Sequence, residues 1–480
     1  MRPRVIISGL KGGSGKTIVS VGLVAAWQKQ GFAVAPFKKG PDFIDASWLA
    51  FAAGRPCYNL DPFLMNEDQI RASFFFGSDV SDLSVIEGNR GLYDGLDLNG
   101  SSSTAGLAKL LRAPVLVILD VTMATRTMAA LVKGCQVFDP DVNIAGLVLN
   151  RVAGSRQERL VTAAIEKYCG LSVVGAIPKL RENLFPERHM GLVPLHERHE
   201  ANEAVSWARK IVEEHLRLDQ IRQLAYASGD FPHGRLGTAR PSPEAAVIGS
   251  SVRIGFIRDR AFWFYYPENL EQLKALGAVM VEINAVSSPE FPKVDALYIG
   301  GGFPETQALA LSENHRFRKG LKKEIEKGLP VYAECGGFMY LGERLLVDNQ
   351  SYPMVGALPV EFILQKRPQG HGYTVLNVSG QNPYYEVGAE VRGHEFHYSR
   401  PVFTRKEDTQ FAFTVSRGRG IDGLRDGVCW KNVLATYTHV HAAGNPRWAK
   451  SLFRAALLYK KSHNSQKREK VTAQYLGEAQ

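Results

Sequence analysis

A glycine-rich turn between an apolar run and a helical segment is the feature that most constrains the fold of this 480-residue chain. Residues 4–8 (RVIIS) lead into residues 9–17 (GLKGGSGKT), and the segment that follows reads as a helix ended by Gly31. Strand, glycine turn and helix in this order are the setting of a P-loop, in which backbone N–H groups at a helix N-terminus cradle phosphates. The turn therefore predicts a site for ATP.

Different residues of this turn are expected to bind different parts of the nucleotide and its metal ion. The Lys16 ammonium would offset the charge of the β- and γ-phosphates, and the Thr17 hydroxyl would bind Mg²⁺. The usual pattern has glycine at position 10, where this chain has Leu10. The predicted ATP-binding residues of the turn are Gly12, Gly13, Gly15, Lys16 and Thr17.

Short β-rich runs, among them 32–37 (FAVAPF) and 172–178 (SVVGAIP), alternate with helical segments over residues 1–190. This alternation predicts a doubly wound, mostly parallel sheet covered by helices. Gly, Pro, Ser and Ala dominate residues 226–250, which we interpret as a linker. A second β/α pattern follows, and its later part has the character of an antiparallel extension. We therefore predict an α/β protein with an N-terminal P-loop domain at 1–225, the linker, a C-terminal α/β domain at 251–459 and a basic flexible tail at 460–480.

Acidic residues follow the next two predicted strands. The stretch KKGPDFID contains Asp42 and Asp45, and the stretch EGNRGLYDG contains Glu87 and Asp94. Ligands of an open parallel sheet gather beyond the carboxyl ends of its strands. We therefore expect Asp42 or Glu87 to join Thr17 in a magnesium site, although a turn or a helix cap is the alternative task for each acid.

Two further residues near the predicted nucleotide site have open alternatives. Asn150 ends the run IAGLVLN, where its amide would read the edge of adenine or form a turn. Lys11 precedes two glycines, a spelling typical of regulatory ATPase switches of the chromosome-partition type, which dimerise with ATP. This alternative predicts a switch instead of an enzyme that uses ATP for chemistry, and it leaves a homodimer open.

Charge and hydropathy exclude several classes of protein. Lys and Arg number 58 against 48 Asp and Glu, a net charge of +10, yet no nucleic-acid motif with interleaved aromatic residues is present. A small polyanionic substrate is therefore favoured over nucleic acid. No apolar stretch approaches the roughly 20 residues of a membrane helix, and the N-terminal apolar run is too short for a signal peptide. We expect a cytoplasmic protein without a membrane partner.

A cysteine between a β-run and two glycines is the second candidate site. PVYAECGGFMYLG places Cys335 at a strand-to-helix turn, where the helix N-terminus should lower the thiol pKa. Gly336 and Gly337 permit a sharp turn, as in a nucleophile elbow. The five cysteines are scattered without a CxxC pair, which argues against zinc and against disulfides. We expect the other four cysteines to be buried and structural.

Histidines and glycines in the same half supply partners for this thiol. TYTHVH contains His439 and His441, which share one side of an extended strand, and a histidine is the usual base for a cysteine nucleophile. The glycine turn in YIGGGFPE offers backbone N–H groups for an oxyanion hole, at Gly301 and Gly302. GHEFHYS adds Glu395 between two more histidines, but no ligand spacing favours a metal there.

Taken in order, these motifs resemble the cobyrinic acid a,c-diamide synthase family. The set is the P-loop, KKGPDFID, EGNRGLYDG, LVLNRV, YIGGGFPE, ECGGFMYLG, GHEFHYS and TYTHVH, and it extends from about residue 4 to about residue 450. The resemblance implies an N-terminal domain similar to dethiobiotin synthetase and a C-terminal class I glutamine amidotransferase domain. It also implies ATP, Mg²⁺ and L-glutamine, with amidation of the a and c acetates of a polycarboxylate tetrapyrrole.

The resemblance implies residue roles as well. Cys335 becomes the glutaminase nucleophile and His439 its base. Class I amidotransferases place a glutamate two residues after that histidine, where this chain has His441. The third member of a catalytic triad is therefore open: Cys335 and His439 act as a dyad, or Glu395 or another residue completes the triad. In the ligase domain a substrate carboxylate would form an acyl phosphate that ammonia then displaces, and the candidate substrate contacts are Lys38, Asp45, Arg90 and Asp94.

Two departures from the family's pattern leave the identity of the tetrapyrrole open. The phosphate loop contains Lys11, where members more often have a threonine-containing loop without this lysine. The acidic motif has Asn89 and Arg90, where an apolar pair is more usual. The same chemistry on sirohaem or on (nickel) sirohydrochlorin is the alternative.

Overall fold

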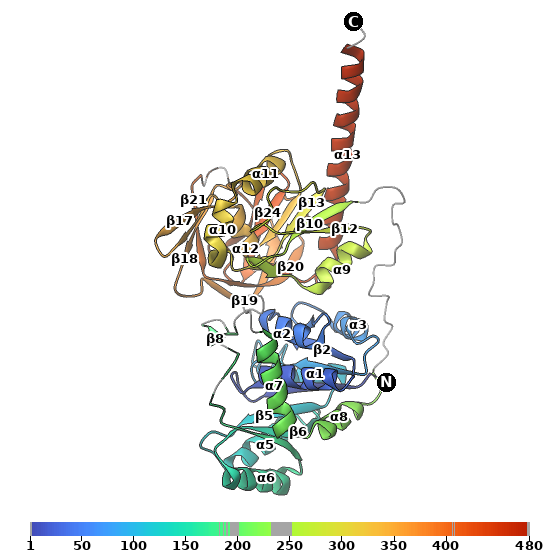
Figure 1. Cartoon of the computed structure of the whole chain (residues 1–480), viewed down its shortest axis with the longest axis vertical. Coiled ribbons are helices and arrows are strands. Elements are labelled where there is room, and N and C mark those ends of the chain that lie inside the picture. Colours follow the sequence, from blue (N-terminus) through green and yellow to red (C-terminus); the bar gives the residue numbers. More distant parts are fainter. Residues whose placement is uncertain are drawn as a thin grey trace. The chain divides into compact units, whose positions relative to one another are not determined.

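The computed structural model describes residues 2–181, 183–185, 187–188, 191–192, 201–231, 252–405, 407 and 409–477. The chain divides into two compact units, Met1–Ala239 and Arg240–Gln480 (Figure 1). Most of the predicted linker, from residue 232 onward, lies outside the described residues. The predicted domain limits within the two units therefore stay predictions.

A seven-stranded sheet forms the centre of the N-terminal unit, with the order β3-β2-β4-β1-β5-β6-β7 (Figure 1). Its strands are β1 (Arg4–Gly9), β2 (Val34–Lys39), β3 (Tyr58–Leu60), β4 (Leu83–Glu87), β5 (Val115–Asp120), β6 (Ile144–Val152) and β7 (Val173–Pro178). Every neighbouring pair is parallel. All residues of β1 and of β4 are buried, so both faces of the sheet are covered, as in a doubly wound fold. The predicted fold of this half is confirmed.

The helices of this unit follow the strands in alternation. They are α1 (Lys16–Lys29), α2 (Ile44–Ala53), α3 (Glu67–Gly77), α4 (Thr104–Leu111), α5 (Thr127–Phe138), α6 (Ser155–Cys169), α7 (Ala201–His215) and α8 (Leu218–Tyr226). A small antiparallel pair, β8 (Glu187–Arg188) and β9 (Gly191–Leu192), comes between β7 and α7. Helix α1 begins directly after Gly15, whose φ of 95° lies in the left-handed region that glycine adopts without strain.

One strand differs from its predicted position. The sequence predicts a strand at 32–37, and the structure places β2 two residues later, at Val34–Lys39. Two lysines thus end a fully buried strand: Lys38 and Lys39 are 1% and 5% exposed. A buried lysine is rare unless paired, so carboxylates must lie close to this strand end.

A ten-stranded mixed sheet forms the centre of the C-terminal unit, with the order β12-β10-β13-β15-β24-β23-β22-β19-β20-β25. Its strands are β10 (Arg253–Ile257), β12 (Val279–Ile283), β13 (Ala296–Ile299), β15 (Val331–Glu334), β19 (Gly370–Val378), β20 (Glu390–His397), β22 (Gln410–Arg417), β23 (Arg425–Trp430), β24 (Val433–Thr436) and β25 (His439–Val440). The strands from β12 to β24 pair in parallel and the rest antiparallel, which confirms the predicted antiparallel extension.

Smaller sheets and helices complete this unit. A four-stranded sheet contains β16 (Arg344–Val347), β17 (Gln350–Pro353), β18 (Val360–Leu364) and β21 (Ser399–Phe403), and β11 (Phe262–Phe264) pairs with β14 (Gly301–Gly302). The helices are α9 (Pro267–Ala275), the 3₁₀ turn η2 (Pro304–Gln307), α10 (Ala308–Glu313), α11 (His315–Glu326), α12 (Gly336–Leu341) and α13 (Pro446–Gly477).

Helix α13 occupies most of the segment for which the sequence predicts a flexible tail. It continues through residues 460–477, beyond the body of the unit in Figure 1. The segment contains four lysines, two glutamines and an arginine, and it has neither proline nor glycine before Gly477. These are good helix formers, so the charge that suggested a tail is also compatible with a helix.

Candidate active site

A cavity of about 460 Å³ lies at the carboxyl ends of the strands of the N-terminal unit. Nearly all of the predicted ligase-site residues line it: Gly12, Gly13, Gly15, Lys16, Thr17, Lys38, Asp42, Asp45, Glu87, Arg90 and Asn150. Asp94 is the exception. Its carboxylate accepts a hydrogen bond from the Gly91 N–H at 2.8 Å and shapes the turn after β4. The P-loop and the two acidic motifs thus meet at the carboxyl ends of the parallel strands.

A buried charged cluster forms one wall of this cavity. Lys38 Nζ lies 2.6 Å from Asp45 Oδ2 and 3.0 Å from Glu87 Oε1. The two carboxylates outweigh the burial of the ammonium and raise the pKa of Lys38 above its ordinary value. Burial raises the pKa of Glu87, and burial together with the charge of Asp45 raises the pKa of Asp42 to about 7. The cluster is therefore crowded with acidic groups that a cation would stabilise.

Residues at this wall fit a magnesium ion. The Thr17 hydroxyl donates to Glu87 Oε1 at 2.7 Å, so the predicted metal ligands already touch. Glu87 Oε2 is buried and has no hydrogen-bond partner among the described residues. A buried carboxylate oxygen without a donor is costly, and oxygen is the ligand atom that Mg²⁺ prefers. Asp42 Oδ1 accepts from the Asp45 N–H at 3.0 Å, so the capping alternative holds for Asp42 while it also lines the cavity.

Asn150 supports the phosphate loop from outside the turn, and Lys11 lies within the turn itself. The Asn150 amide donates to the Ser14 carbonyl at 2.8 Å, so this side chain braces the loop against β6. Lys11 is largely exposed and lies 3.4 Å from Asp120 of its own chain. Burial alone would raise the pKa of Asp120, but hydrogen bonds from Thr122 and the charge of Arg151 lower it to about 2. Lys11 therefore faces a permanent anion within the chain.

The end of β7 and the segment after it supply lining residues that the sequence reasoning missed. They are Ile177, Lys179, Leu180, Arg181, Asn183 and Phe185. These residues could have been predicted, because ligands of a parallel sheet gather beyond the carboxyl ends of its strands. The run SVVGAIP was predicted as a strand, and Lys179 follows its end directly. The two cations in this segment add positive charge to a cavity suited to phosphates and carboxylates.

In the C-terminal unit, Cys335 lies in a strained turn between β15 and α12. Its φ of 47° and ψ of −101° are unusual for a residue with a side chain. The glycines that follow are required by close contacts: a Cβ on Gly337 would lie 2.6 Å from the Ile299 carbonyl oxygen, and one on Gly336 would lie 3.0 Å from that of Gly302. The ECGG motif therefore forms the predicted elbow.

The predicted pKa of this thiol is wrong in direction. Cys335 is 5% exposed, and its Sγ donates to the Phe396 carbonyl at 3.5 Å. Burial, with the charge of Glu305 second, raises the thiol pKa above its ordinary value, and the Gly336 N–H offsets this only in part. Helix α12 has only six residues, so its N-terminal field is weak compared with the loss of water. The resting side chain is a thiol, and its activation requires a base.

The predicted oxyanion glycines lie beside the elbow. Gly301 and Gly302 form β14, and the Cβ position of Gly336 is 3.1 Å from the Gly302 nitrogen. The Gly300 N–H donates to the Tyr265 hydroxyl at 2.8 Å, which anchors the start of this segment. The backbone that would stabilise an oxyanion is thus held next to the sulfur-bearing turn.

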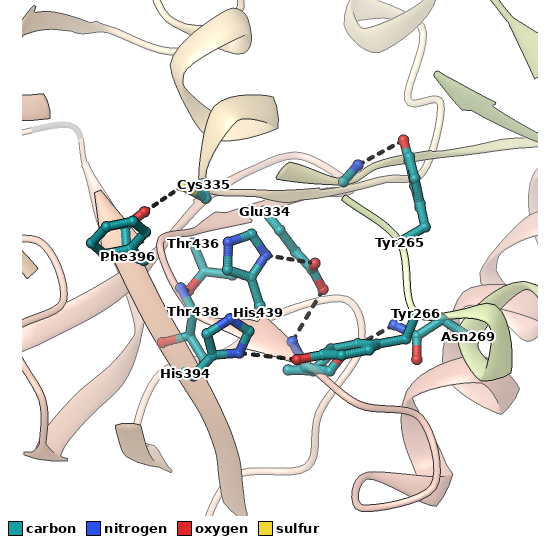
Figure 2. A network of polar contacts seen from close by, with 12 residues as sticks. Tyr265, Tyr266, Asn269, Glu334, Cys335, His394, Phe396, Thr436, Thr438 and His439 are labelled. Atoms are coloured by element: carbon teal, nitrogen blue, oxygen red, sulfur yellow. Dashed lines mark hydrogen bonds and ion pairs between the residues drawn. The ribbon is translucent and has the colours of Figure 1, made fainter. Parts of the chain in front are cut away.

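His439 lies against the same glycines. A Cβ on Gly301 would be 2.4 Å from His439 Cε1, so only glycine leaves room for the imidazole. The ring stacks on His394 at a centroid distance of 4.9 Å and packs on Phe264 at 4.3 Å. Its Nδ1 lies 3.2 Å from Glu334 Oε2, the contact drawn in Figure 2. Burial, with His397 second, lowers the pKa of His439 to about 3, so the ring is neutral and able to accept a proton.

Neither Glu395, the named candidate for the third member, nor His441, which occupies the position of the class I glutamate, contacts His439 by a hydrogen bond that the structure records. His441 Nε2 faces Glu268 Oε1 at 3.4 Å. Glu395 accepts from the N–H groups of Arg419 and Gly420. The carboxylate at His439 is instead Glu334, which the sequence reasoning missed. Its signal was an acidic residue ending an apolar β-run, directly before the cysteine.

Comparison with known proteins decides the family. Residues 5–193 match the CobQ/CobB/MinD/ParA nucleotide binding domain, and residues 253–447 match the CobB/CobQ-like glutamine amidotransferase domain. A cobyrinate a,c-diamide synthase of Magnetococcus marinus is 42% identical over 452 residues, which cover 94% of this chain and 97% of that relative. The chain belongs to the cobyrinate a,c-diamide synthase family.

Further family members extend this likeness over nearly the whole chain. The cobyrinate a,c-diamide synthase of Archaeoglobus fulgidus is 39% identical across 95% of this chain and 98% of its own length. That of Listeria innocua is 36% identical across 94% and 99%. The predicted resemblance is confirmed, and with it the class of enzyme: a glutamine-hydrolysing ligase with a nucleotide-binding domain. Among the described residues, no helix has the length and apolar character needed to cross a membrane.

Proposed function

We propose that this family member uses ATP, Mg²⁺ and L-glutamine to convert the a and c acetates of cobyrinate to amides. The observation that carries the proposal is the presence of two sites in one chain. One is a glycine strand, Gly301–Gly302, that contacts both the turn of a buried thiol and a neutral imidazole, and the other is a P-loop cavity walled by lysines and carboxylates. The names of the family members supply the substrate. The cytoplasmic location and the homodimer stay predictions.

Ammonia release begins at the C-terminal site. The Cys335 sulfur attacks the side-chain amide carbon of glutamine while His439 accepts the thiol proton. Backbone N–H groups of Gly301 and Gly302 stabilise the oxyanion of the tetrahedral intermediate. The C–N bond then breaks, and ammonia leaves with the proton that His439 returns. Water hydrolyses the resulting thioester to glutamate and regenerates the thiol.

Activation of the acceptor takes place in the P-loop cavity. An acetate oxygen of the tetrapyrrole attacks the γ-phosphorus, and the bond from that phosphorus to ADP breaks. Ammonia then attacks the acyl carbon, the C–O bond to phosphate breaks, and the nitrogen loses a proton to give the amide. Thr17, Glu87 and Asp42 would hold Mg²⁺, which supplies charge neutralisation at the phosphates. Lys16 and Lys38 add positive charge, and Arg90 is placed to meet a further carboxylate.

The proposal is tested with the purified full chain, glutamine, Mg-ATP and a panel of cobyrinate, hydrogenobyrinate, nickel sirohydrochlorin and sirohaem. We expect glutamate, ADP and a product in which two hydroxyl groups of cobyrinate have been replaced by amino groups, seen by mass spectrometry. Amidation of sirohaem or nickel sirohydrochlorin instead would support the alternative substrates. ATP-driven dimerisation without glutamate release would support a switch ATPase and contradict the proposal.

Division of labour between the two sites is tested by Cys335→Ala. This variant should lose glutamate release because the nucleophile is absent. It should keep amidation when ammonium salts are supplied at high pH, because the P-loop cavity is unchanged. Equal loss of ammonia-dependent amidation would contradict the assignment of the two reactions to separate sites.

A further inference from the structure

We propose that Glu334 is the positioning residue of the glutaminase site. Its carboxylate holds the His439 ring so that Nδ1 carries the hydrogen and Nε2 is free to take the Cys335 proton. The inference rests on the proposed glutaminase function of this unit. It places the third member immediately before the nucleophile in the chain, instead of two residues after the histidine.

The contact network supports this role directly. Glu334 Oε2 lies 3.2 Å from His439 Nδ1, and both side chains are 2% exposed. The second oxygen, Oε1, accepts from the Val440 N–H at 3.3 Å. The carboxylate therefore contacts both the ring of His439 and the backbone of the next residue, which fixes the imidazole and its strand together.

A second layer of hydrogen bonds holds the carboxylate itself. The Tyr298 hydroxyl on β13 donates to Glu334 Oε2 at 3.2 Å. Asn269 on α9 donates to that hydroxyl at 3.1 Å and to the Val440 carbonyl at 2.9 Å. Figure 2 labels Asn269, Glu334 and His439 of this network. Such outer contacts are what hold a catalytic imidazole within the narrow range of geometries that proton transfer requires.

Strand geometry explains how consecutive residues serve one imidazole. Glu334 ends β15 in register with Thr436 of β24, three residues before His439. The positive φ of Cys335 then turns the chain at the elbow, while the Glu334 carboxylate contacts His439 and Val440. A regular strand would send the two side chains to opposite faces, and the strained turn removes that restriction.

The electrostatics of Glu334 and His439 suit the transfer of the thiol proton to the imidazole. Burial raises the pKa of Glu334 to about 8, against hydrogen bonds from Val440 and Tyr298 that lower it. When His439 takes the thiol proton, an ionised Glu334 offsets the new positive charge, as the aspartate does in Ser-His-Asp sites. Other titratable groups near the pair are His394, His397, Tyr265, Tyr298, Tyr332, Tyr385 and Cys335.

These shifts give the pH dependence a definite sign. His439, with a pKa of about 3, is neutral across the assay range. Glu334 must lose its proton before it can accept the Nδ1 hydrogen, and its pKa of about 8 places that step in the alkaline range. The kcat/KM for glutamine of the free enzyme should therefore rise as pH increases through about 8.

The experiment compares the full-length wild type with Glu334→Gln, in glutamate release and in ammonia-dependent amidation. An amide keeps the size of the side chain but removes the charge and the preference for one imidazole tautomer. We expect kcat for glutamine to fall on the order of 10²- to 10⁴-fold with KM little changed. The rise near pH 8 should disappear, while ammonia-dependent amidation stays at the wild-type rate.

Glu395→Gln is the matched control, since Glu395 is an equally buried carboxylate of the same unit that contacts backbone N–H groups and faces His397 at 3.8 Å instead of His439. It should retain the rise near pH 8. Tyr298→Phe removes one donor to the ionised carboxylate, so it should move that rise to higher pH, and it tests the inference even where Glu334→Gln fails to fold.

A Glu334→Gln enzyme with wild-type kcat and pH profile would overturn the inference. So would a Tyr298→Phe enzyme with an unmoved profile. If the wild type itself releases no glutamate, the proposed function fails instead, so the two failures are distinct.

Discussion

Replacing Lys38 by methionine tests whether the acidic wall of the P-loop cavity depends on a buried cation. The ammonium is 2% exposed and contacts two carboxylates, at 2.6 and 3.0 Å. Its loss leaves the buried Glu87 and the partly buried Asp45 without their counter-charge, next to Asp42. Removing one partner of a buried ion pair costs about 3–5 kcal/mol. For a unit of this size each kcal/mol corresponds to roughly 2–4 °C, so the melting temperature should fall by about 6–20 °C.

The pH dependence of this loss has a sign that the structure dictates. Lys38 lowers the pKa values of Asp42 and Glu87, so its removal raises them further. Asp42 already titrates near 7, far above an ordinary aspartate, so its ionisation destabilises the fold as pH rises from about 4 to 7. The deficit of Lys38→Met should therefore be largest above pH 7 and shrink as the carboxylates take up protons near pH 5.

Differential scanning calorimetry of the full chain measures this prediction, with the N-terminal transition identified by its response to added Mg-ATP. Lys11→Met is the control, because Lys11 is 68% exposed and its pair with Asp120 is worth about 0–1 kcal/mol. A Lys38→Met protein within about 0.5 kcal/mol of the wild type at pH 8 would refute the reasoning.

Three further substitutions test the two sites. Glu87→Gln should weaken Mg²⁺ activation of ADP formation about 10-fold or more, since it removes charge from a carboxylate that touches Thr17; an unchanged Mg²⁺ titration would contradict the metal assignment. Gly301→Ala should abolish glutamate release but spare ammonia-dependent amidation, because the new Cβ would lie 2.4 Å from the imidazole of His439; wild-type glutaminase activity would show that the ring does not work in this position. Asn150→Ala should raise the Kd for ATP about 5- to 10-fold, because it removes the hydrogen bond from Asn150 to the phosphate loop, worth about 1 kcal/mol. Isothermal titration calorimetry measures the Kd, and an unchanged value would show that this hydrogen bond does not support ATP binding.

Much of the fold could be predicted because its signals are local. Alternating β-rich and helical segments, and glycines at strand ends, located both sheets and the two loops that carry chemistry. The position of β2 was wrong by two residues because lysines are usually excluded from buried strands. Lys38 is tolerated there by Asp45 and Glu87, and the latter is 49 residues away in sequence. Compensation of that kind becomes visible only once β2 and β4 are paired.

The glutaminase residues show the same limit. Cys335 and the glycines around it were predictable from the elbow motif, but the direction of the thiol pKa was not. A helix N-terminus is a local feature, whereas burial depends on everything that packs against the turn. Glu334 was missed because its task is defined by a contact with His439, 105 residues later. The family pattern drew attention to position 441, where the side chain contacts Glu268 instead.

Because Glu334 and Cys335 are adjacent in the chain, glutaminase activity also depends on the register of β15 against β24. A slip of β15 by one residue against β24 would put Ala333 or Cys335 in the place of Glu334 opposite Thr436, and it would move the sulfur away from the elbow. A chain misfolded in this way keeps its secondary structure and most of its hydrophobic core yet has neither group where the imidazole needs it. Recovery of glutamate release during refolding therefore reports the correct pairing of these two strands, which circular dichroism cannot distinguish from the slipped one.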